Sequence, residues 1–130
     1  MPSAPAYREL LLEWGLNIGT PTQPTAFFIA FNTQDPLEAG TGEATELPRT
    51  AVTNWNVGTP ADGTVQNTDA GETATGATGG VTVSHFSVWD SGTSSAGTYY
   101  FGGPLTGGDQ ILANGDKLSW GAGDLTASIT

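Results

Sequence analysis

The stretch Thr25-Ala-Phe-Phe-Ile-Ala-Phe31 decides the fold of this chain. It is a near-continuous run of apolar and aromatic residues, and its length is that of a β-strand. Such a run is typical of a central strand whose two faces are both covered. Pro21 and Pro24 mark the connection that leads into it. Other parts of the chain must therefore cover this strand on both sides.

Strands are also predicted in the C-terminal half. Val81-Thr-Val-Ser-His-Phe-Ser-Val-Trp-Asp90 is expected to form one long strand with both faces partly apolar. The segment Ser91–Gly97 predicts a hairpin loop into a further strand at Thr98–Phe101. Leu125–Ile129 alternates between apolar and polar residues, which predicts a half-buried strand at the end of the chain.

Asn114-Gly115-Asp116 is the strongest hairpin signal, because Asn-Gly suits a type I′ turn. It predicts pairing between Gln110–Ala113 and Lys117–Trp120. Earlier in the chain, Thr50–Val57 alternates only in part, which indicates a bulge or a shift in register. Residues 58–80 hold Val65 as their one large apolar anchor, and the sequence leaves open whether they form edge strands or an exposed loop.

The first segment carries the one convincing helix. Its apolar residues fall at positions i, i+3, i+4 and i+7, on one face: Tyr7, Leu10, Leu11 and Trp14. The helix is expected to begin near Ser3 or Pro5 and to end at Gly15 in a left-handed cap. A helix this short must dock on something, either its own sheet or a neighbouring subunit. Residues 1–20 are thus predicted to form an N-terminal helical arm.

A long acidic connection runs from Asn32 to Pro48 and contains Asp35 and Glu38. Loops of this length in a compact domain are usually functional or interfacial. Together, one helix and about six to eight strands at short spacing predict a mainly β protein. We expect an antiparallel β-sandwich or small β-barrel with one short N-terminal α-helix, in a single domain over residues 1–130.

The charge balance excludes some partners. Thirteen acidic residues stand against three basic ones, for a formal net charge of −10. This charge repels phosphate, so direct nucleic-acid binding is not expected. The apolar runs are too short to span a bilayer, no secretory signal is visible, and the absence of cysteine excludes a thiolate nucleophile. No membrane partner is expected.

The residues offer little chemistry. His85 is the single histidine, and Asp90 falls on the opposite face of its predicted strand, so we expect no catalytic residues. The acidic loop could offer oxygen ligands to calcium, but its spacing does not match an EF-hand, and no metal or cofactor is expected. Aromatic side chains could stack on sugars, a role that predicts surface exposure for some of Trp55, Trp89 and Tyr99.

Several segments resemble small tailed-phage virion proteins, often labelled tail-fibre-like. Thr25–Glu43 shares the aromatic strand, Asp-Pro and Ala-Gly-Thr-Gly-Glu, and Val83–Asp90 shares the Ser-His-Phe strand. The similarity continues through Tyr100–Thr106 and Asn114–Thr126, whereas residues 55–80 depart from it. The resemblance implies a structural component of the virion without catalytic residues.

Within that group, the small size and acidic surface favour a capsid cement or decoration protein. It would form a homo-oligomer, a trimer by the resemblance, and would bind and stabilise the shell of major capsid protein. The alternatives are a tail or tail-fibre-adaptor protein that binds tail proteins, and a carbohydrate-binding module for host recognition. The residues expected at the partner interface lie in the helix and the acidic loop: Tyr7, Leu10, Leu11, Trp14, Asp35 and Glu38.

Overall fold

The computed structural model describes residues 3–22, 26–52, 54–57 and 63–129. The chain is mainly β. Among these residues there is one helix, the short N-terminal one. The elements, in chain order, are α1 (Pro5–Gly15), β1 (Phe28–Asn32), β2 (Thr50–Ala51), β3 (Trp55–Val57), β4 (Thr64–Asn67), β5 (Gly71–Glu72), β6 (Val81–Val83), β7 (His85–Trp89), β8 (Tyr99–Pro104), β9 (Gln110–Leu112), β10 (Ser119–Trp120) and β11 (Thr126–Ser128).

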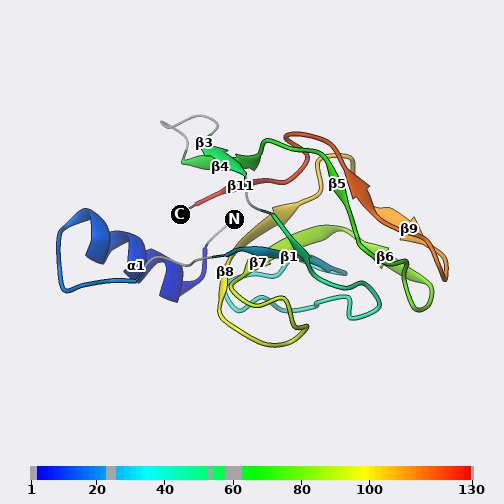
Figure 1. Cartoon of the computed structure of the whole chain (residues 1–130), viewed down its shortest axis with the longest axis horizontal. Helices are drawn as coiled ribbons and strands as arrows, with labels where there is room; N and C mark the ends of the chain where they lie inside the picture. The colour runs from blue at the N-terminus through cyan, green and yellow to red at the C-terminus, as the bar shows by residue number, and fades with distance from the viewer. Residues whose placement is uncertain (1–2, 23–25, 53, 58–62, 130) are drawn as a thin grey trace.

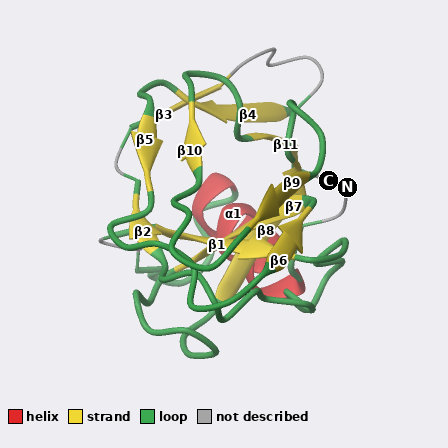
Figure 2. Cartoon of the chain, turned by 90° about the vertical axis from the view of Figure 1, so that its right-hand side faces the viewer, coloured by secondary structure: helices red, strands yellow, loops and turns green. Residues whose placement is uncertain are grey.

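The described strands form antiparallel sheets that do not close into a barrel. A four-stranded sheet has the order β2-β1-β7-β8, and a three-stranded sheet has the order β11-β4-β3. The two lie in separate layers, while the pairs β5–β10 and β6–β9 stand at one side (Figures 1 and 2). The core fills the space between the layers, where Trp55 of β3 packs edge-on against Phe101 of β8.

The prediction of a covered central strand is confirmed for β1. It lies between β2 and β7, and residues 29–32 are all buried. Residues 23–25, which include the predicted start of this strand, lie outside the described residues. The hairpin around Ser91–Gly97 is confirmed as well, because β7 pairs with β8 across it. At the end of the chain, Leu125 and Ala127 are buried and their neighbours are not, as the alternation predicts.

Two strand predictions are wrong for the same reason, namely that neighbouring segments join different sheets. Val81–Asp90 is not one strand, because β6 pairs with β9 whereas β7 pairs with β1 and β8. Thr50–Val57 contains no bulged strand among its described residues, because β2 pairs with β1 whereas β3 pairs with β4. Residue 53 lies outside the described residues.

The predicted hairpin at Asn114-Gly115 is also wrong. A turn does form, since the Asp116 amide donates to the Ala113 carbonyl (3.0 Å) and Gly115 has a positive φ of 90°. Asn114 lacks the positive φ that a type I′ turn requires, so the predicted turn type is wrong as well. The flanking strands then part, because β9 pairs with β6 and β10 pairs with β5. The Ala77 amide donates to the Asp116 carbonyl (2.8 Å), so the turn bonds to the segment around Ala77 and its two flanking strands do not pair with each other.

The stretch that the sequence left open supplies β4, the strand β5 that pairs with β10, and the Ala77 contact to the turn. β4 is the middle strand of its sheet, and Val65 packs partly buried against the core. Asn67 at its end is buried and fully bonded, since its amide group donates to the Asp69 and Gly121 carbonyls and its oxygen accepts from the Leu125 amide. Residues 58–62 lie outside the described residues.

Candidate interaction surface

The first half of α1 packs against the core. Ala4 is buried, and its amide donates to the Tyr100 carbonyl at 2.8 Å. The Tyr7 ring lies 5.2 Å from that of Tyr100 and 5.5 Å from that of Phe101. Leu10 is also packed against the core. Of the two docking modes left open by the sequence, this end of the helix uses its own sheet, so Tyr7 and Leu10 are largely covered already.

The second half of the helix extends beyond the sheet, together with the turn that follows it (Figure 1). Its large apolar side chains stand in solvent: Leu11 (41% exposed), Leu12 (61%), Trp14 (66%), Leu16 (66%) and Ile18 (55%). We call these five residues the apolar crest. Elsewhere on the described part of the chain, large apolar side chains stand exposed only at Leu37 and Ile111. Such a concentration is typical of a contact surface.

The turn after α1 extends the crest past the helix. Gly15 is the last helical residue but does not adopt the left-handed conformation that the sequence predicted for it; Asn17 does, with φ 55°. The Ile18 amide then donates to the Glu13 carbonyl at 2.8 Å, which closes the helix end. The helical periodicity identified Leu11 and Trp14, but it missed Leu12, Leu16 and Ile18. The signal available was the density of large apolar residues in a chain that has few of them.

The acidic loop lies beside the helix. Glu38 accepts from Arg8 of α1 at 3.4 Å, and Arg8 also donates to the Ser3 carbonyl. The structure thus brings together the two elements predicted to form the interface. Asp35 is half-buried and accepts from the Leu37 amide at 2.8 Å, so its carboxylate fixes the local turn. Among the charged candidates, Glu38 is the more exposed.

The rest of the loop folds back onto the protein through Arg49. This guanidinium donates to both Glu43 carboxylate oxygens (2.7 and 3.1 Å) and to the carbonyls of Ser91 and Ala96 (2.8 Å each). It also lies 4.3 Å from the centre of the Trp89 ring. The Arg49 side chain is fully buried. The loop is therefore tied at its far end to the β7–β8 hairpin and does not extend towards a neighbour there.

Tyr99 holds the near end of the loop. Its hydroxyl donates to the Leu37 carbonyl at 3.1 Å, and its ring packs against Trp89 at 5.4 Å. Burial, and secondly the negative charge of Asp35, raise the pKa of Tyr99 well above its ordinary value. Tyr100 donates to Asp90 at 3.3 Å, and burial followed by the Asp90 charge raises its pKa as well. Both phenols are thus held neutral in the folded protein.

The model of one protein family, the podophage GP4 fiber I protein gp80, matches residues 4–128. The chain belongs to this family. It is therefore a structural component of a tailed-phage virion. No curated protein matches the chain. The match spans α1, the acidic loop and residues 55–80, the stretch that seemed to depart from the resemblance.

The remaining sequence candidates of this gp80-family chain take structural positions. His85 Nδ1 lies 2.7 Å from Ser84 Oγ, while Asp90, just past the other end of β7, accepts from the Thr98 amide at 2.7 Å, so the two do not meet. No three His, Cys, Asp or Glu side chains gather in a potential metal site within the described ranges. Trp89 and Tyr99 are buried and Trp55 is half-buried, so these rings do not form an exposed sugar-stacking platform.

None of the helices that the structure describes is long and apolar enough to cross a membrane.

Proposed function

We propose that this gp80-family protein is a fibre-associated structural component, a tail or fibre-adaptor protein, which docks on another virion protein through its apolar crest. The exposure of the crest carries the proposal. Five large apolar side chains in solvent are costly for a chain of low hydrophobic content, and burial against a partner removes that cost. Trp14 is the natural anchor, since buried tryptophans dominate interface energetics.

The charges around the crest indicate what kind of partner surface would complement it. Glu9 and Glu13 flank the crest on α1, and Glu38 of the loop pairs with Arg8 one turn before the crest begins. Arg8, the nearby cation, already contacts Glu38. A partner surface with an apolar groove and basic residues at its rim would complement this arrangement.

The fiber protein in the family's name supports the fibre role over the cement role. A cement protein that binds the major capsid protein would be present in many copies over the capsid, whereas a fibre component would be present in few copies and in tail fractions. Counting copies per virion by quantitative mass spectrometry separates the two. A high count on tail-free capsids would overturn the fibre assignment in favour of the cement role.

The crest is tested by substitution. Removing residues 1–16 would be a poor test, because Ala4 and Tyr7 cover the core and their loss would destabilise the domain. Trp14→Ser and Leu12→Ser leave the core intact, so the free energy of unfolding should change by less than about 0.5 kcal/mol. Incorporation into virions should fall, with an affinity loss of roughly 30-fold or more for the tryptophan.

Ile111→Ser is the matched control, because Ile111 is 83% exposed on β9, away from the crest. It makes the same kind of apolar-to-polar change and should leave incorporation as in the wild type. Normal incorporation of both crest variants would refute the docking proposal.

We further propose that the protein self-associates, as a trimer by its phage relationship, and that it has no catalytic activity. Sedimentation of the purified protein tests the first claim, and a stable monomer both free and in the particle would contradict it. Assays with glycan, peptidoglycan and ester substrates test the second. Turnover that His85→Ala abolishes would overturn it.

A further inference from the structure

The turn at residues 113–116 contains a chemically labile pair of residues. Asn114-Gly115 is the one Asn-Gly pair in the chain, and each of the other five asparagines is followed by Ile, Thr, Trp or Val. Glycine has no side chain that would keep its backbone nitrogen away from the asparagine side chain before it. We propose that Asn114 is a site of spontaneous deamidation, and that the contact of this turn with residues 76–77 suppresses the reaction in the folded protein.

The reaction needs only the chain and water. The Gly115 backbone nitrogen attacks the side-chain carbonyl carbon of Asn114, so that a new C–N bond forms and the C–NH₂ bond of the side chain breaks. The backbone amide proton leaves with the amino group as ammonia. Water then opens the cyclic imide at either carbonyl, which yields aspartate or isoaspartate. Both products add a negative charge, and isoaspartate also lengthens the backbone of the turn by a methylene group.

The folded protein holds the attacking nitrogen in a hydrogen bond. The Gly115 amide donates to the Ala77 carbonyl at 2.7 Å, and the Ala77 amide donates to the Asp116 carbonyl at 2.8 Å. Ala77 is buried in the core, so its carbonyl is a fixed acceptor. The Asn114 side chain is exposed, but the reaction must break the bond between Gly115 and Ala77 before the nitrogen can attack. Local opening of the turn therefore controls the rate.

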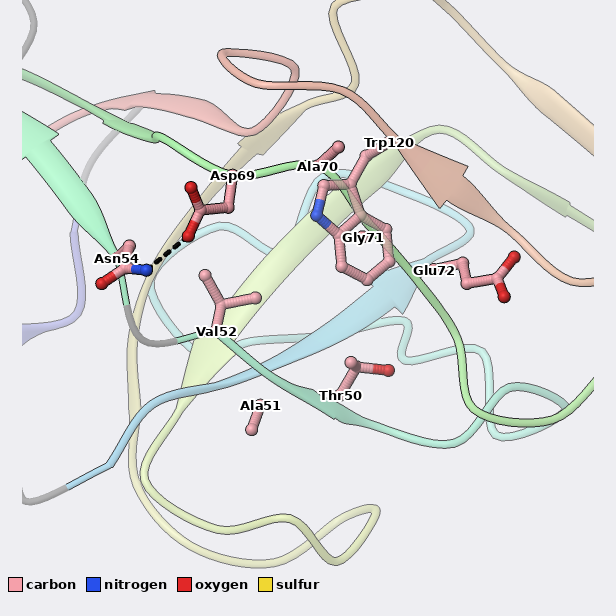
Figure 3. Close-up of a pocket in the computed structure, with 9 residues that line it drawn as sticks. All are labelled: Thr50, Ala51, Val52, Asn54, Asp69, Ala70, Gly71, Glu72 and Trp120. Carbon is pink, nitrogen blue, oxygen red and sulfur yellow. Dashed lines mark hydrogen bonds between the residues drawn. The ribbon is translucent and has the colours of Figure 1, made fainter.

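The pairing of β5 with β10 brings the segment around Ala77 to the turn. Figure 3 shows the start of this contact, where Gly71 lies beside the Trp120 indole at the wall of a cavity of about 220 Å³. Near the turn itself, a Cβ on Gly76 would lie 2.1 Å from the Gly115 carbonyl oxygen. Glycine at position 76 thus lets the two backbones come close enough to form the protecting hydrogen bond.

Peptide mapping by mass spectrometry, with an enzymatic assay for isoaspartate, tests the proposal at mildly alkaline pH. In guanidinium chloride Asn114 should deamidate, while the other asparagines stay intact over the same period. In the native protein the rate at Asn114 should be lower by roughly tenfold or more, because opening of the turn costs the hydrogen bond to Ala77. An intact Asn114 in the unfolded chain would overturn the proposal, as would equal rates in the native and unfolded protein.

Gly76→Ala tests the contact that protects the turn. The added Cβ displaces the Gly115 backbone, so the native rate should rise towards the unfolded rate, while the unfolded rate stays unchanged. Gly79→Ala is the matched control, since a Cβ there meets no atom within 4 Å, and it should react as the wild type does. Equal native rates in the two variants would refute a protective role of residues 76–77.

Hydrogen exchange of the wild-type protein gives a test that does not depend on the folding of Gly76→Ala. The Gly115 amide should exchange more slowly than in the unfolded chain, by about the same factor as the deamidation of Asn114, because both processes need the turn to open. Exchange of the Gly115 amide at the unprotected rate would overturn the proposal.

Discussion

The N-terminal helix and the acidic loop contact each other at Arg8 and Glu38, yet they differ in which kind of side chain they bury and which they expose. The loop turns charge inward, where Glu43 and Arg49 form a buried pair tied to the β7–β8 hairpin. The helix turns apolar side chains outward at Leu12 and Trp14. The difference teaches that charge in this acidic chain is partly structural, whereas exposed apolar surface is scarce among the described residues and is the surface that we propose for docking.

A substitution at the buried end of the loop should have the largest effect on the free energy of unfolding. Arg49→Ala leaves the Glu43 carboxylate buried without its cation and leaves the Ser91 and Ala96 carbonyls without a donor. We expect a loss of about 3–5 kcal/mol in the free energy of unfolding, measured by urea denaturation. Lys117→Ala is the matched control, because the Lys117–Glu72 pair is exposed at 3.8 Å and should contribute well under about 1 kcal/mol. Equal losses in both variants would show that the loop is not held by its buried charge.

Tyr99 tests the other end of the loop and its dependence on pH. Burial raises the pKa of Tyr99, so the neutral phenol is stabilised by folding. That stability is fully present below the unfolded value of about 10 and is lost as the pH rises towards the folded pKa. Tyr99→Phe should cost about 1 kcal/mol at pH 7 through the lost hydrogen bond to Leu37.

Between pH 10 and 12 the Tyr99→Phe variant should lose less stability than the wild type does. Urea denaturation at pH 7 and pH 11 measures both effects. Equal alkaline losses in variant and wild type would show that Tyr99 is not the responsible phenol, and would leave Tyr7 and Tyr100, whose pKa values burial also raises.

The contact between the helix and the loop should contribute least to the free energy of unfolding. Glu38→Gln removes the charge that faces Arg8, but both side chains are partly exposed and the two atoms lie 3.4 Å apart. We expect a change below about 0.5 kcal/mol in the free energy of unfolding, measured by thermal denaturation at low and at physiological salt. A loss above about 1 kcal/mol would show that helix and loop act as one unit, and the contrast drawn between them would then fail.

The sequence predicted those parts of the fold that local pattern determines. The run at Phe28–Phe31 gave the correct burial because a continuous apolar run places apolar side chains on both faces of a strand. The alternation of Leu125–Ile129 did so because side chains alternate along a strand whatever its partner is. The predicted hairpin at Asn114-Gly115 failed although a turn does form there. Its strands pair with β5 and β6, and no local signal distinguishes such distant partners from adjacent ones.

The interaction surface could be predicted from the sequence to about the same extent as the fold. Periodicity placed Tyr7, Leu10, Leu11 and Trp14 on one helix face, but it could not show where the sheet below them ends. That boundary separates the covered residues from the exposed ones. Arg49 had no motif around it; its signal was rarity, as one of three basic residues in the chain. A rare cation in an acidic sequence is a candidate for a buried ion pair. The cavity beside Trp120 could not be predicted, because it depends on strand pairings that the sequence did not reveal.

The order β11-β4-β3 has a consequence for the timing of folding during synthesis. β4 ends at residue 67, yet the strand on its other side begins at residue 126. A nascent chain on the ribosome therefore holds β4 with one open edge until residues 126–128 have been translated. Pairing between such distant segments is slow, on the order of milliseconds to seconds. Until β11 pairs with it, the open β4 edge is exposed to premature association with other nascent chains.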